Sequence, residues 1–244
     1  MSANTMTSSR FSTRPLYLQL RDALVQRIAA GEWKPGTAIP NESDLAREFG
    51  VSSGTMRKAL DMLEAERLLT RRQGRGTFVN DPASDELAVR FSNVRGPGGE
   101  RVSGDVRSTE VEEAAANEVE CVRLRLRRQD RVLRLKRVRY MGEKPIMVEH
   151  ASLPAALFPG FVGKEGVSHR IVLLAQQYGI LLGKAEERVS IGTASPAVAE
   201  ALGIEPDAPL LLLDRVVHTL DGRPIEWRVA HCHLADQYYL AEMT

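Results

Sequence analysis

A short stretch of the sequence carries hydroxyl and cationic side chains at a spacing suited to binding phosphates and base edges. Ser52, Ser53 and Thr55 stand where a helix would begin, and Arg57 and Lys58 follow within the next turn. Hydroxyls and free backbone N–H groups at a helix N-terminus bind phosphate, and cationic side chains on an exposed helix face reach base edges in the major groove. The pattern indicates a nucleic-acid contact, although one basic helix could also be an ordinary solvated surface.

A second basic stretch, rich in glycine, follows soon after. Arg72, Gly74 and Arg75 lie within RRQGRG, residues 71–76, between two short apolar runs. Glycine allows the backbone to approach a ligand closely, and arginine side chains can enter a narrow groove of DNA. We expect this segment to be the turn of a hairpin that touches DNA beside the helix.

Arginines in the second half of the chain could bind an anion. Arg137 and Arg139 share the parity of the apolar residues Leu133 and Leu135, and alternate side chains of a strand point to one face. An unpaired charge on a buried face is costly. The two arginines therefore indicate either a pocket for an anionic ligand or an internal network of ion pairs with glutamates, and the residues alone leave both open.

The run His231-Cys232-His233 raises the possibility of a metal site, but its spacing argues against one. On a strand Cys232 points away from the face that its two neighbours share, and two ligands are too few for a closed zinc site. No Ser-His-Asp pattern, P-loop or His-Glu-x-x-His motif occurs in the sequence. We therefore expect no metal, no cofactor and no catalytic residue.

The elements that must position the first two sets of residues are three helices and a hairpin. Apolar residues recur every fourth position over 16–28, and shorter amphipathic segments follow at 41–50 and 52–63. Two short strands around the glycine-rich turn occupy 68–79. Helices and a basic hairpin in this order predict a winged helix-turn-helix over residues 10–80.

The remainder of the chain predicts an α+β domain with an antiparallel sheet. Residues 81–86 are a candidate linker, and residues 87–244 form the second domain. Period-two patterns predict strands, and Ser or Ser-Pro starts predict helices. The expected strands are 122–127, 132–140, 146–151 and a closing hairpin over 210–233, and the expected helices are 168–178 and 195–203.

Composition and charge limit the classes of function. Residues 1–80 carry 12 Lys+Arg against 8 Asp+Glu, whereas the whole chain has a net charge of only +1. Aromatic residues are 5% of the chain, too few for a platform that stacks single-stranded bases. No apolar run approaches the roughly 20 residues of a membrane span, and the N-terminus lacks the apolar segment of a signal peptide. We expect a soluble, cytoplasmic protein.

Several motifs resemble those of a known family. PLYLQL (15–20), GEWKPGTAIPNE (31–42), LAREFGVSSGTMRKAL (45–60) and RRQGRGTFV (71–79) look like the DNA-binding domain of GntR-type transcription regulators. RVRYMGEKPIMVEHASLPAALFPGF (137–161) and LLLLDRVVHTLDGRPIEWRV (210–229) resemble the UTRA effector domain of the HutC branch, whose fold is related to chorismate lyase.

The resemblance implies roles for particular residues of the first domain. Ser52, Thr55, Arg57 and Gly74 fall on positions that touch operator DNA in the family. Many members have arginine at the positions of Ser43 and Ser53, so the operator read by this chain can differ from the commonest family site. Lys58, Arg72 and Arg75 are candidates to supply replacement charge.

The resemblance also implies a ligand pocket in the second domain. Arg137, Arg139, Glu149 and Glu226 fall on family pocket positions. We add the helix start at Ser168 and Arg170, whose N–H groups could hold a phosphate or carboxylate, and Ser92 as a further candidate. Where many members have a tyrosine, this chain has Cys232, which argues against a phosphosugar ligand.

These features together predict a ligand-responsive transcription regulator that binds a palindromic operator as a homodimer, most simply a repressor. Its partners would be double-stranded DNA, a small effector of anionic character and a second copy of the chain. Two alternatives remain: a chorismate lyase-like enzyme fused to a DNA-binding module, and an architectural DNA-binding protein without a ligand. The effector, the regulated genes and the sign of regulation do not follow from the sequence.

Overall fold

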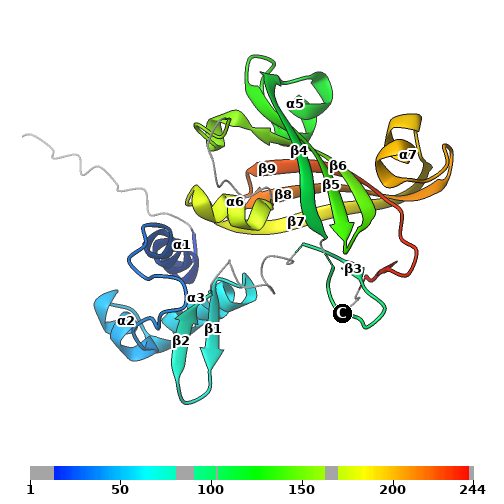
Figure 1. The fold of residues 1–244 in the computed structure, drawn as a ribbon. Helices are drawn as coiled ribbons and strands as arrows, with labels where there is room; N and C mark the ends of the chain where they lie inside the picture. The colour runs from blue at the N-terminus through cyan, green and yellow to red at the C-terminus, as the bar shows by residue number, and fades with distance from the viewer. Residues whose placement is uncertain (1–13, 81–90, 103, 163–169, 242–244) are drawn as a thin grey trace, which may run out of the picture. The chain divides into compact units, whose positions relative to one another are not determined.

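The chain consists of two compact units, Met1–Asp81 and Pro82–Thr244. The computed structural model describes residues 14–80, 91–102, 104–162 and 170–241. Figure 1 shows a small unit of helices with one hairpin and a larger unit built around a sheet.

The first unit contains the three helices and the hairpin that the sequence predicts. In chain order its elements are α1 (Leu16–Ala29), α2 (Glu42–Glu48), α3 (Ser53–Ala65), β1 (Leu69–Arg72) and β2 (Gly76–Val79). β1 and β2 pair antiparallel, and Ala38 adds an isolated bridge to Phe78. The winged helix-turn-helix fold is thereby confirmed.

Local signals set the ends of these helices. The side-chain oxygen of Asn41 accepts a hydrogen bond from the backbone N–H of Asp44 and caps α2, as Ser52 does for α3. Gly50, in the turn between the two helices, has φ +64°, a conformation that glycine adopts without strain. The apolar stripe of α1 is buried only in part, since Leu16 is 51% exposed. The core joins all three helices to the hairpin: Leu20, Leu24, Trp33, Ile39, Leu45, Ala46, Met56, Ala59, Leu60, Leu63, Leu69 and Val79.

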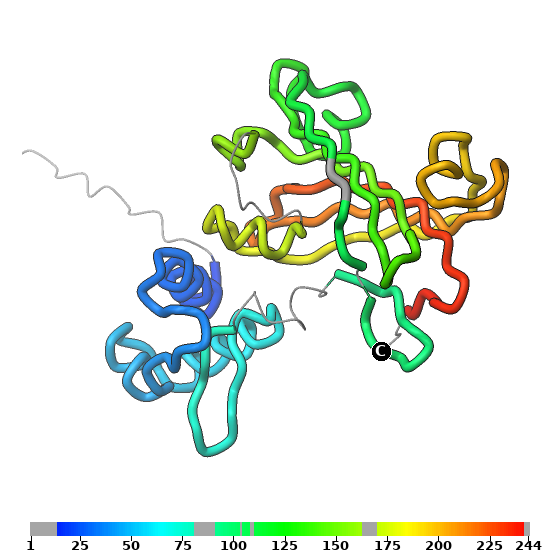
Figure 2. The backbone as a smooth tube through the Cα atoms, viewed as in Figure 1, coloured from blue at the N-terminus to red at the C-terminus, as the bar shows by residue number. Residues whose placement is uncertain are grey.

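The second unit is built on an antiparallel sheet of six strands. Its elements are β3 (Val94–Arg95), β4 (Asp105–Ala115), α5 (Glu118–Leu124), β5 (Arg131–Met141), β6 (Lys144–Pro154), η1 (Ala155–Leu157), α6 (Ile171–Gln177), β7 (Leu182–Thr193), α7 (Pro196–Leu202), β8 (Pro209–Thr219), β9 (Pro224–Cys232) and β10 (Tyr238–Tyr239). The strand order is β4-β5-β6-β9-β8-β7. β3 and β10 form a separate antiparallel pair, so the last described strand, red in Figure 2, returns to lie beside the first strand of this unit.

Helices cover both faces of the sheet. α6 packs against Leu133, Leu135, Ala151 and Leu153, which the strand register places on one face. α7 packs against Val148 and α5 near Val132, on the opposite face. This arrangement confirms the expected α+β class, and the face that carries α6 is the one that receives Arg137 and Arg139.

Three expectations for this unit were wrong or incomplete. Residues 122–127 form no strand, since α5 ends in that segment. An Asn117–Glu120 capping box starts this helix, and Arg125 ends it with φ +53°. The sequence pattern also missed the two outer strands, β4 and β7. The helix expected over 168–178 is observed as α6, while residues 168–169 lie outside the described part of the chain.

Candidate functional site

The outer face of α3 presents the two cations that the sequence singled out. Arg57 and Lys58 are both exposed. The Arg57 guanidinium donates to the Glu42 carboxylate through Nη2 at 2.8 Å and Nε at 3.1 Å. The Lys58 ammonium lies 3.9 Å from the centre of the Tyr17 ring, a cation–π contact. Glu42 and Tyr17 thus orient the two cations, a role that the sequence analysis did not assign to them.

The N-terminus of α3 carries the three predicted hydroxyls. Ser52 Oγ accepts from the Thr55 backbone N–H at 3.2 Å and lies 2.8 Å from Thr55 Oγ1. Ser52 and Thr55 therefore satisfy each other as a helix cap, while Ser53 is exposed at the first turn. All three hydroxyls stand at the end of the helix where backbone N–H groups lack intrahelical partners.

The hairpin that follows α3 is anchored to that helix and exposed at its tip. Arg71 Nη1 contacts Asp61 at 2.6 Å and Glu64 at 2.8 Å, so its charge is used to hold the hairpin base against α3. Arg72 stacks over Phe78 at 4.8 Å, and Arg75 is exposed. Gly74 and Gly76 have φ +69° and +108°, values that explain why glycine stands at both positions. The cations of the helix and of the hairpin therefore belong to one compact unit.

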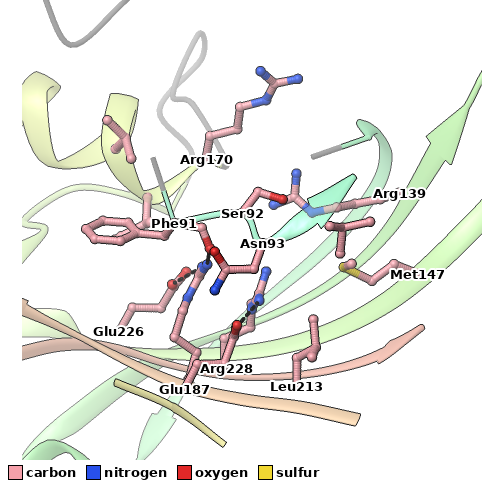
Figure 3. A pocket seen from close by; sticks show the side chains of 14 residues that line it. Phe91, Ser92, Asn93, Arg139, Met147, Arg170, Glu187, Leu213, Glu226 and Arg228 are labelled. Atoms are coloured by element: carbon pink, nitrogen blue, oxygen red, sulfur yellow. Dashed lines mark hydrogen bonds and ion pairs between the residues drawn. The ribbon is translucent and has the colours of Figure 1, made fainter. Parts of the chain in front are cut away.

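In the second unit, charged side chains from five strands gather on the face of the sheet that carries α6. Arg137 and Arg139 come from β5, Glu149 from β6 and Glu226 from β9, and each of the four is at least 94% buried. Three more residues belong to this charged cluster: Arg215 of β8, Arg228 of β9 and Glu187 of β7. None of the three was predicted from the sequence. Figure 3 shows several of these side chains converging on one cavity.

Glu149 and Glu226 are the two acceptors at the centre of the charged cluster. Glu149 Oε2 lies 2.6 Å from Arg139 Nε and 3.2 Å from Arg137 Nε, and its other oxygen accepts from Arg228. Glu226 lies 3.3 Å from Arg137 Nη2. Its second oxygen is 3.2 Å from Arg215 Nη2. These contacts form an internal network of ion pairs, which is one of the two possibilities that the sequence left open.

The outer member of the charged cluster, Glu187, joins it to the end of the chain. Glu187 accepts from Arg228 Nη2 at 3.2 Å and from the Tyr239 hydroxyl at 2.9 Å. The parity of β8 and β9 could have flagged Arg215 and Arg228, because each alternates with buried apolar neighbours as Arg137 does. Four arginines against three glutamates leave the charged cluster with a formal charge of +1.

A cavity of about 40 Å³ lies beside the charged cluster. At roughly 10–15 Å³ per water it has room for a few water molecules. Arg139, Glu187, Arg215, Glu226 and Arg228 all line it, together with Ser92 and Arg170. Figure 3 shows Arg170 at the margin, with its guanidinium directed away from the other labelled side chains.

Two of the predicted effector residues use their side chains in contacts within the protein. Ser92 lines the cavity, but its hydroxyl donates to the backbone carbonyl of Val102. Arg170 is the N-cap residue of α6, and its side chain lies 3.4 Å from both the Gly104 carbonyl and Asp105. Ser168 lies outside the described residues.

Burial and ion pairing act in opposite directions on the titration of the charged cluster. Burial by itself raises the pKa of Glu149, but Arg139, Arg137 and Arg228 outweigh it and hold that pKa well below its ordinary value. The pKa of Glu226 is lowered in the same way: burial raises it, and the charge of Arg215 makes the largest contribution in the opposite direction. Burial lowers the pKa of Arg139 to about 10. Both carboxylates and Arg139 are therefore charged at neutral pH.

The lowered pKa values predict a loss of stability in acid. A carboxyl whose pKa is lower in the folded than in the unfolded chain contributes stability above its unfolded pKa and loses that contribution as pH falls. For Glu149 and Glu226 the loss starts near the ordinary value of 4.5. We expect the free energy of unfolding of the second unit, measured by urea denaturation, to stay level between about pH 7 and 5.5 and to fall steeply below about pH 4.5, by up to ~1.4 kcal/mol per pH unit for each group.

This pH dependence can be measured by tryptophan fluorescence. Trp33 lies in the first unit and Trp227 in the second, so a Trp33→Phe variant leaves one reporter, in the unit of interest. A midpoint that stays constant down to pH 3 would show that the two carboxylates are not selectively stabilised by folding.

Of the His-Cys-His run, His231 and Cys232 end β9 and point to opposite faces as expected, whereas His233 follows the strand. His231 lies with its ring centre 6.0 Å from that of His150 on the face opposite the charged cluster. Cys232 is buried, and burial raises the pKa of its thiol to about 12. Within the described residues, no three His, Cys, Asp or Glu side chains are grouped as metal ligands.

The fold and the two sites define a class: a winged helix-turn-helix unit joined to an α+β unit with a buried charged cluster. Comparison with known proteins places the chain within that class. Residues 16–79 match the model of bacterial regulatory proteins of the gntR family, and residues 102–238 match the UTRA domain. The chain therefore belongs to the GntR family of transcription regulators, in the branch that carries a UTRA domain, and it is a regulator and not an enzyme.

Relatives of similar length support this assignment. The chain is 30% identical over 217 residues to the mannosyl-D-glycerate transport/metabolism system repressor MngR of Escherichia coli, covering 88% of this chain and 90% of that protein. It is 31% identical over 213 residues to the histidine utilization repressor of Pseudomonas putida, covering 86% and 84%. The ligand-binding domain of a GntR-family regulator from Bordetella bronchiseptica superimposes with a TM-score of 0.58 at 26% identity, over 64% of this chain and 98% of that domain. Among the described helices, none is long and apolar enough to span a membrane.

Proposed function

We propose that this regulator represses transcription by binding a palindromic operator as a homodimer, and that a small anionic effector changes its affinity for DNA. The observation that carries the effector part is the charged cluster, which has one more arginine than glutamate in a buried place. Relatives named as repressors support the sign of regulation. Operator DNA as the target assigns the protein to the cytoplasm.

Operator contacts come from the outer face of α3, its N-terminus and the hairpin. Arg57 and Lys58 are exposed, so they can reach base edges once the helix enters the major groove. The remaining residues of the proposed contact surface bind phosphates or allow close approach of the backbone: Ser52, Ser53, Thr55, Arg72, Gly74 and Arg75. In the free protein the Arg57 guanidinium donates to Glu42. On binding DNA, Arg57 must either give up this hydrogen bond or keep it while it also contacts DNA.

Effector contacts come from the charged cluster and its margin. The proposed set is Ser92, Arg137, Arg139, Glu149, Ser168, Arg170 and Glu226, to which the geometry adds Arg215 and Arg228. Because the cavity is small, an effector must displace side chains of the charged cluster on entry. An anion fits this environment because it offsets the excess arginine charge and receives charge-assisted hydrogen bonds. Ligand binding would thereby favour one dimer geometry and change DNA affinity.

The test is fluorescence anisotropy with labelled DNA from upstream of the protein's own gene. The full chain is titrated at about 0.15 M salt with excess nonspecific competitor, because salt governs nonspecific binding, and again in the presence of a fractionated metabolite extract. Competitor-resistant binding that an anionic fraction weakens supports the proposal. Binding that no fraction alters contradicts the effector claim, and binding lost to competitor contradicts the operator claim.

Arg170→Ala tests the margin of the cavity without disturbing the buried ion pairs. We expect the active metabolite fraction to be needed at a roughly tenfold to hundredfold higher concentration, which corresponds to the ~1.5–3 kcal/mol of one charge-assisted hydrogen bond. DNA affinity and the melting temperature should remain at wild-type values, because Arg170 is partly exposed and lies outside the first unit. Arg107→Ala, another partly exposed arginine of the same unit, is the matched control. An unchanged dose response would remove Arg170 from the effector site.

A further inference from the structure

A second cavity of the second unit lies where β6 ends and β9 begins. Its volume is about 370 Å³, and sites that hold small molecules have volumes of roughly 300–1,000 Å³. Its wall comes from three segments that are distant in the chain: the end of α5, the segment around η1 and the turn between β8 and β9. Among the described residues, none that lines this cavity also lines the cavity beside the charged cluster.

The wall of this second cavity is mostly apolar. The apolar side chains that line it are Leu124, Leu126, Pro154, Ala156, Leu157 and Pro224. Binding sites for small molecules typically combine such a wall with a few polar groups that fix the orientation of the ligand. An apolar ligand body would leave water on entering, a transfer that is favourable in proportion to the apolar area buried.

Two arginines that line the second cavity have no ion-pair partner among the described residues. Arg125 and Arg223 are both exposed. Arg125 Nη1 lies 3.4 Å from the Gly222 carbonyl, which is a long contact for a hydrogen bond. The carboxylate on the wall, Asp221, accepts from the Thr219 hydroxyl. Two arginines and one aspartate give the lining a formal charge of +1.

An adjoining cavity of about 690 Å³ shows a different arrangement of charge. It is also lined by two arginines, Arg127 and Arg131, but each pairs with a carboxylate of the same cavity. Arg127 lies 3.0 Å from Asp130, and Arg131 lies 2.6 Å from Glu113. The charges of this larger cavity are therefore matched within the protein. Of the two cavities, the smaller one has arginines available to an anion.

The backbone conformation of Arg125 supports a role for its side chain. Arg125 has φ +53° and ψ +45°, the left-handed conformation, and its N–H donates to the Cys121 carbonyl at the end of α5. Glycine commonly occupies this place at the end of a helix, because a residue with a side chain is strained in this conformation. Strained backbone conformations cluster at functional sites, and here the strained residue brings a guanidinium to the cavity.

We propose that the second cavity binds an amphipathic anion with a compact apolar body and one carboxylate. The apolar body contacts the leucines and prolines of the wall, and the carboxylate receives charge-assisted hydrogen bonds from Arg125 and Arg223. The long contact of Arg125 with Gly222 is readily exchanged for these stronger bonds. Because the two cavities share no lining residue, this site is additional to the effector site of the proposed function and does not depend on it.

Saturation-transfer NMR of the full chain with cyclohexanecarboxylate tests this site. We expect saturable binding with a Kd on the order of 1 mM, which is an affinity that ligands with few heavy atoms reach. Cyclohexanecarboxamide has the same apolar body without the charge, so it should bind at least roughly tenfold more weakly. Equal binding of the acid and the amide would overturn the role of the carboxylate. Absence of saturable binding of the acid up to about 10 mM would overturn the site.

Arg125→Gly tests where the ligand binds. Glycine adopts φ +53° without strain, so the melting temperature should stay at the wild-type value. The Kd for cyclohexanecarboxylate should rise at least roughly tenfold, the effect of one lost charge-assisted hydrogen bond. Arg127→Ala, at an exposed arginine two residues further along the chain, is the matched control and should bind normally. A normal Kd in Arg125→Gly would overturn the proposal. A Kd raised by Arg170→Ala and not by Arg125→Gly would assign the ligand to the charged cluster and also overturn it.

Discussion

Glu149→Gln is expected to lower the free energy of unfolding of the second unit by about 3–5 kcal/mol, the usual cost of breaking a buried ion pair from one side. Glu149 is fully buried and contacts Arg137, Arg139 and Arg228. Glutamine preserves the shape of the side chain but removes the charge. Four buried arginines would then face two carboxylates.

The matched control is Glu110→Gln on β4. Glu110 is paired with Lys136 at 3.3 Å, but its side chain is 71% exposed. Exposed pairs contribute little, so we expect a change within about 0.5 kcal/mol. Urea unfolding of both variants in the Trp33→Phe background measures the difference. If the free energy of unfolding of Glu149→Gln lay within about 1 kcal/mol of the parent value, water would have to solvate the arginines in place of the lost charge. That result would contradict the burial of this site in the structure.

Because breaking a buried ion pair is expected to destabilise the second unit strongly, substitutions of the buried arginines are poor tests of effector binding. Arg137→Ala would remove a partner of both Glu149 and Glu226, so a lost ligand response in that variant could reflect unfolding. Arg170, at the margin of the cavity, reports on ligand binding with less risk to the fold.

Arg57→Ala is expected to weaken operator binding by roughly 1–3 kcal/mol, about fivefold to 150-fold in Kd, without unfolding the protein. The Arg57 side chain is 65% exposed and makes its ion pair with Glu42. Exposed pairs of this kind add little stability, whereas an arginine in the major groove can bond a base edge with two hydrogen bonds. The loss should therefore appear in DNA affinity and hardly at all in melting temperature.

Two further measurements distinguish the kinds of contact that Arg57 makes. A base contact predicts that Arg57→Ala relaxes preference at one operator position, whereas a phosphate contact predicts a uniform loss across sequences and a salt dependence reduced by about one ion. Arg128→Ala, at an arginine 82% exposed in the second unit, controls for the loss of one positive charge. Unchanged operator affinity in Arg57→Ala would leave Lys58 and the hairpin arginines as the contacts.

The first unit could be predicted closely because its elements are marked by local signals. Asn41 and Ser52 cap the helices that follow them. Gly50, Gly74 and Gly76 have positive φ, so single residues mark where the chain turns. The apolar spacing of α3 likewise follows from helical period alone. Only the partners of the exposed cations, Glu42 for Arg57 and Tyr17 for Lys58, required the packed structure.

The second unit shows where such signals mislead. The alternation of Val122, Leu124 and Leu126 with arginines resembles a strand, but the Asn117–Glu120 capping box starts a helix there. The sequence pattern did not predict β4 and β7, because outer strands are exposed on much of their surface and carry charged residues of low β-propensity.

The DNA-binding fold, the family and the parity that turns Arg137 and Arg139 toward one face could all be inferred from the amino-acid sequence. The packed sheet was needed to show that Arg215, Arg228 and Glu187 join them, and that Glu149 is the shared acceptor. The physical reason is that these contacts depend on which strands become neighbours. The order β4-β5-β6-β9-β8-β7 brings together residues far apart in the chain, and that order is set by long-range pairing and packing rather than by local sequence.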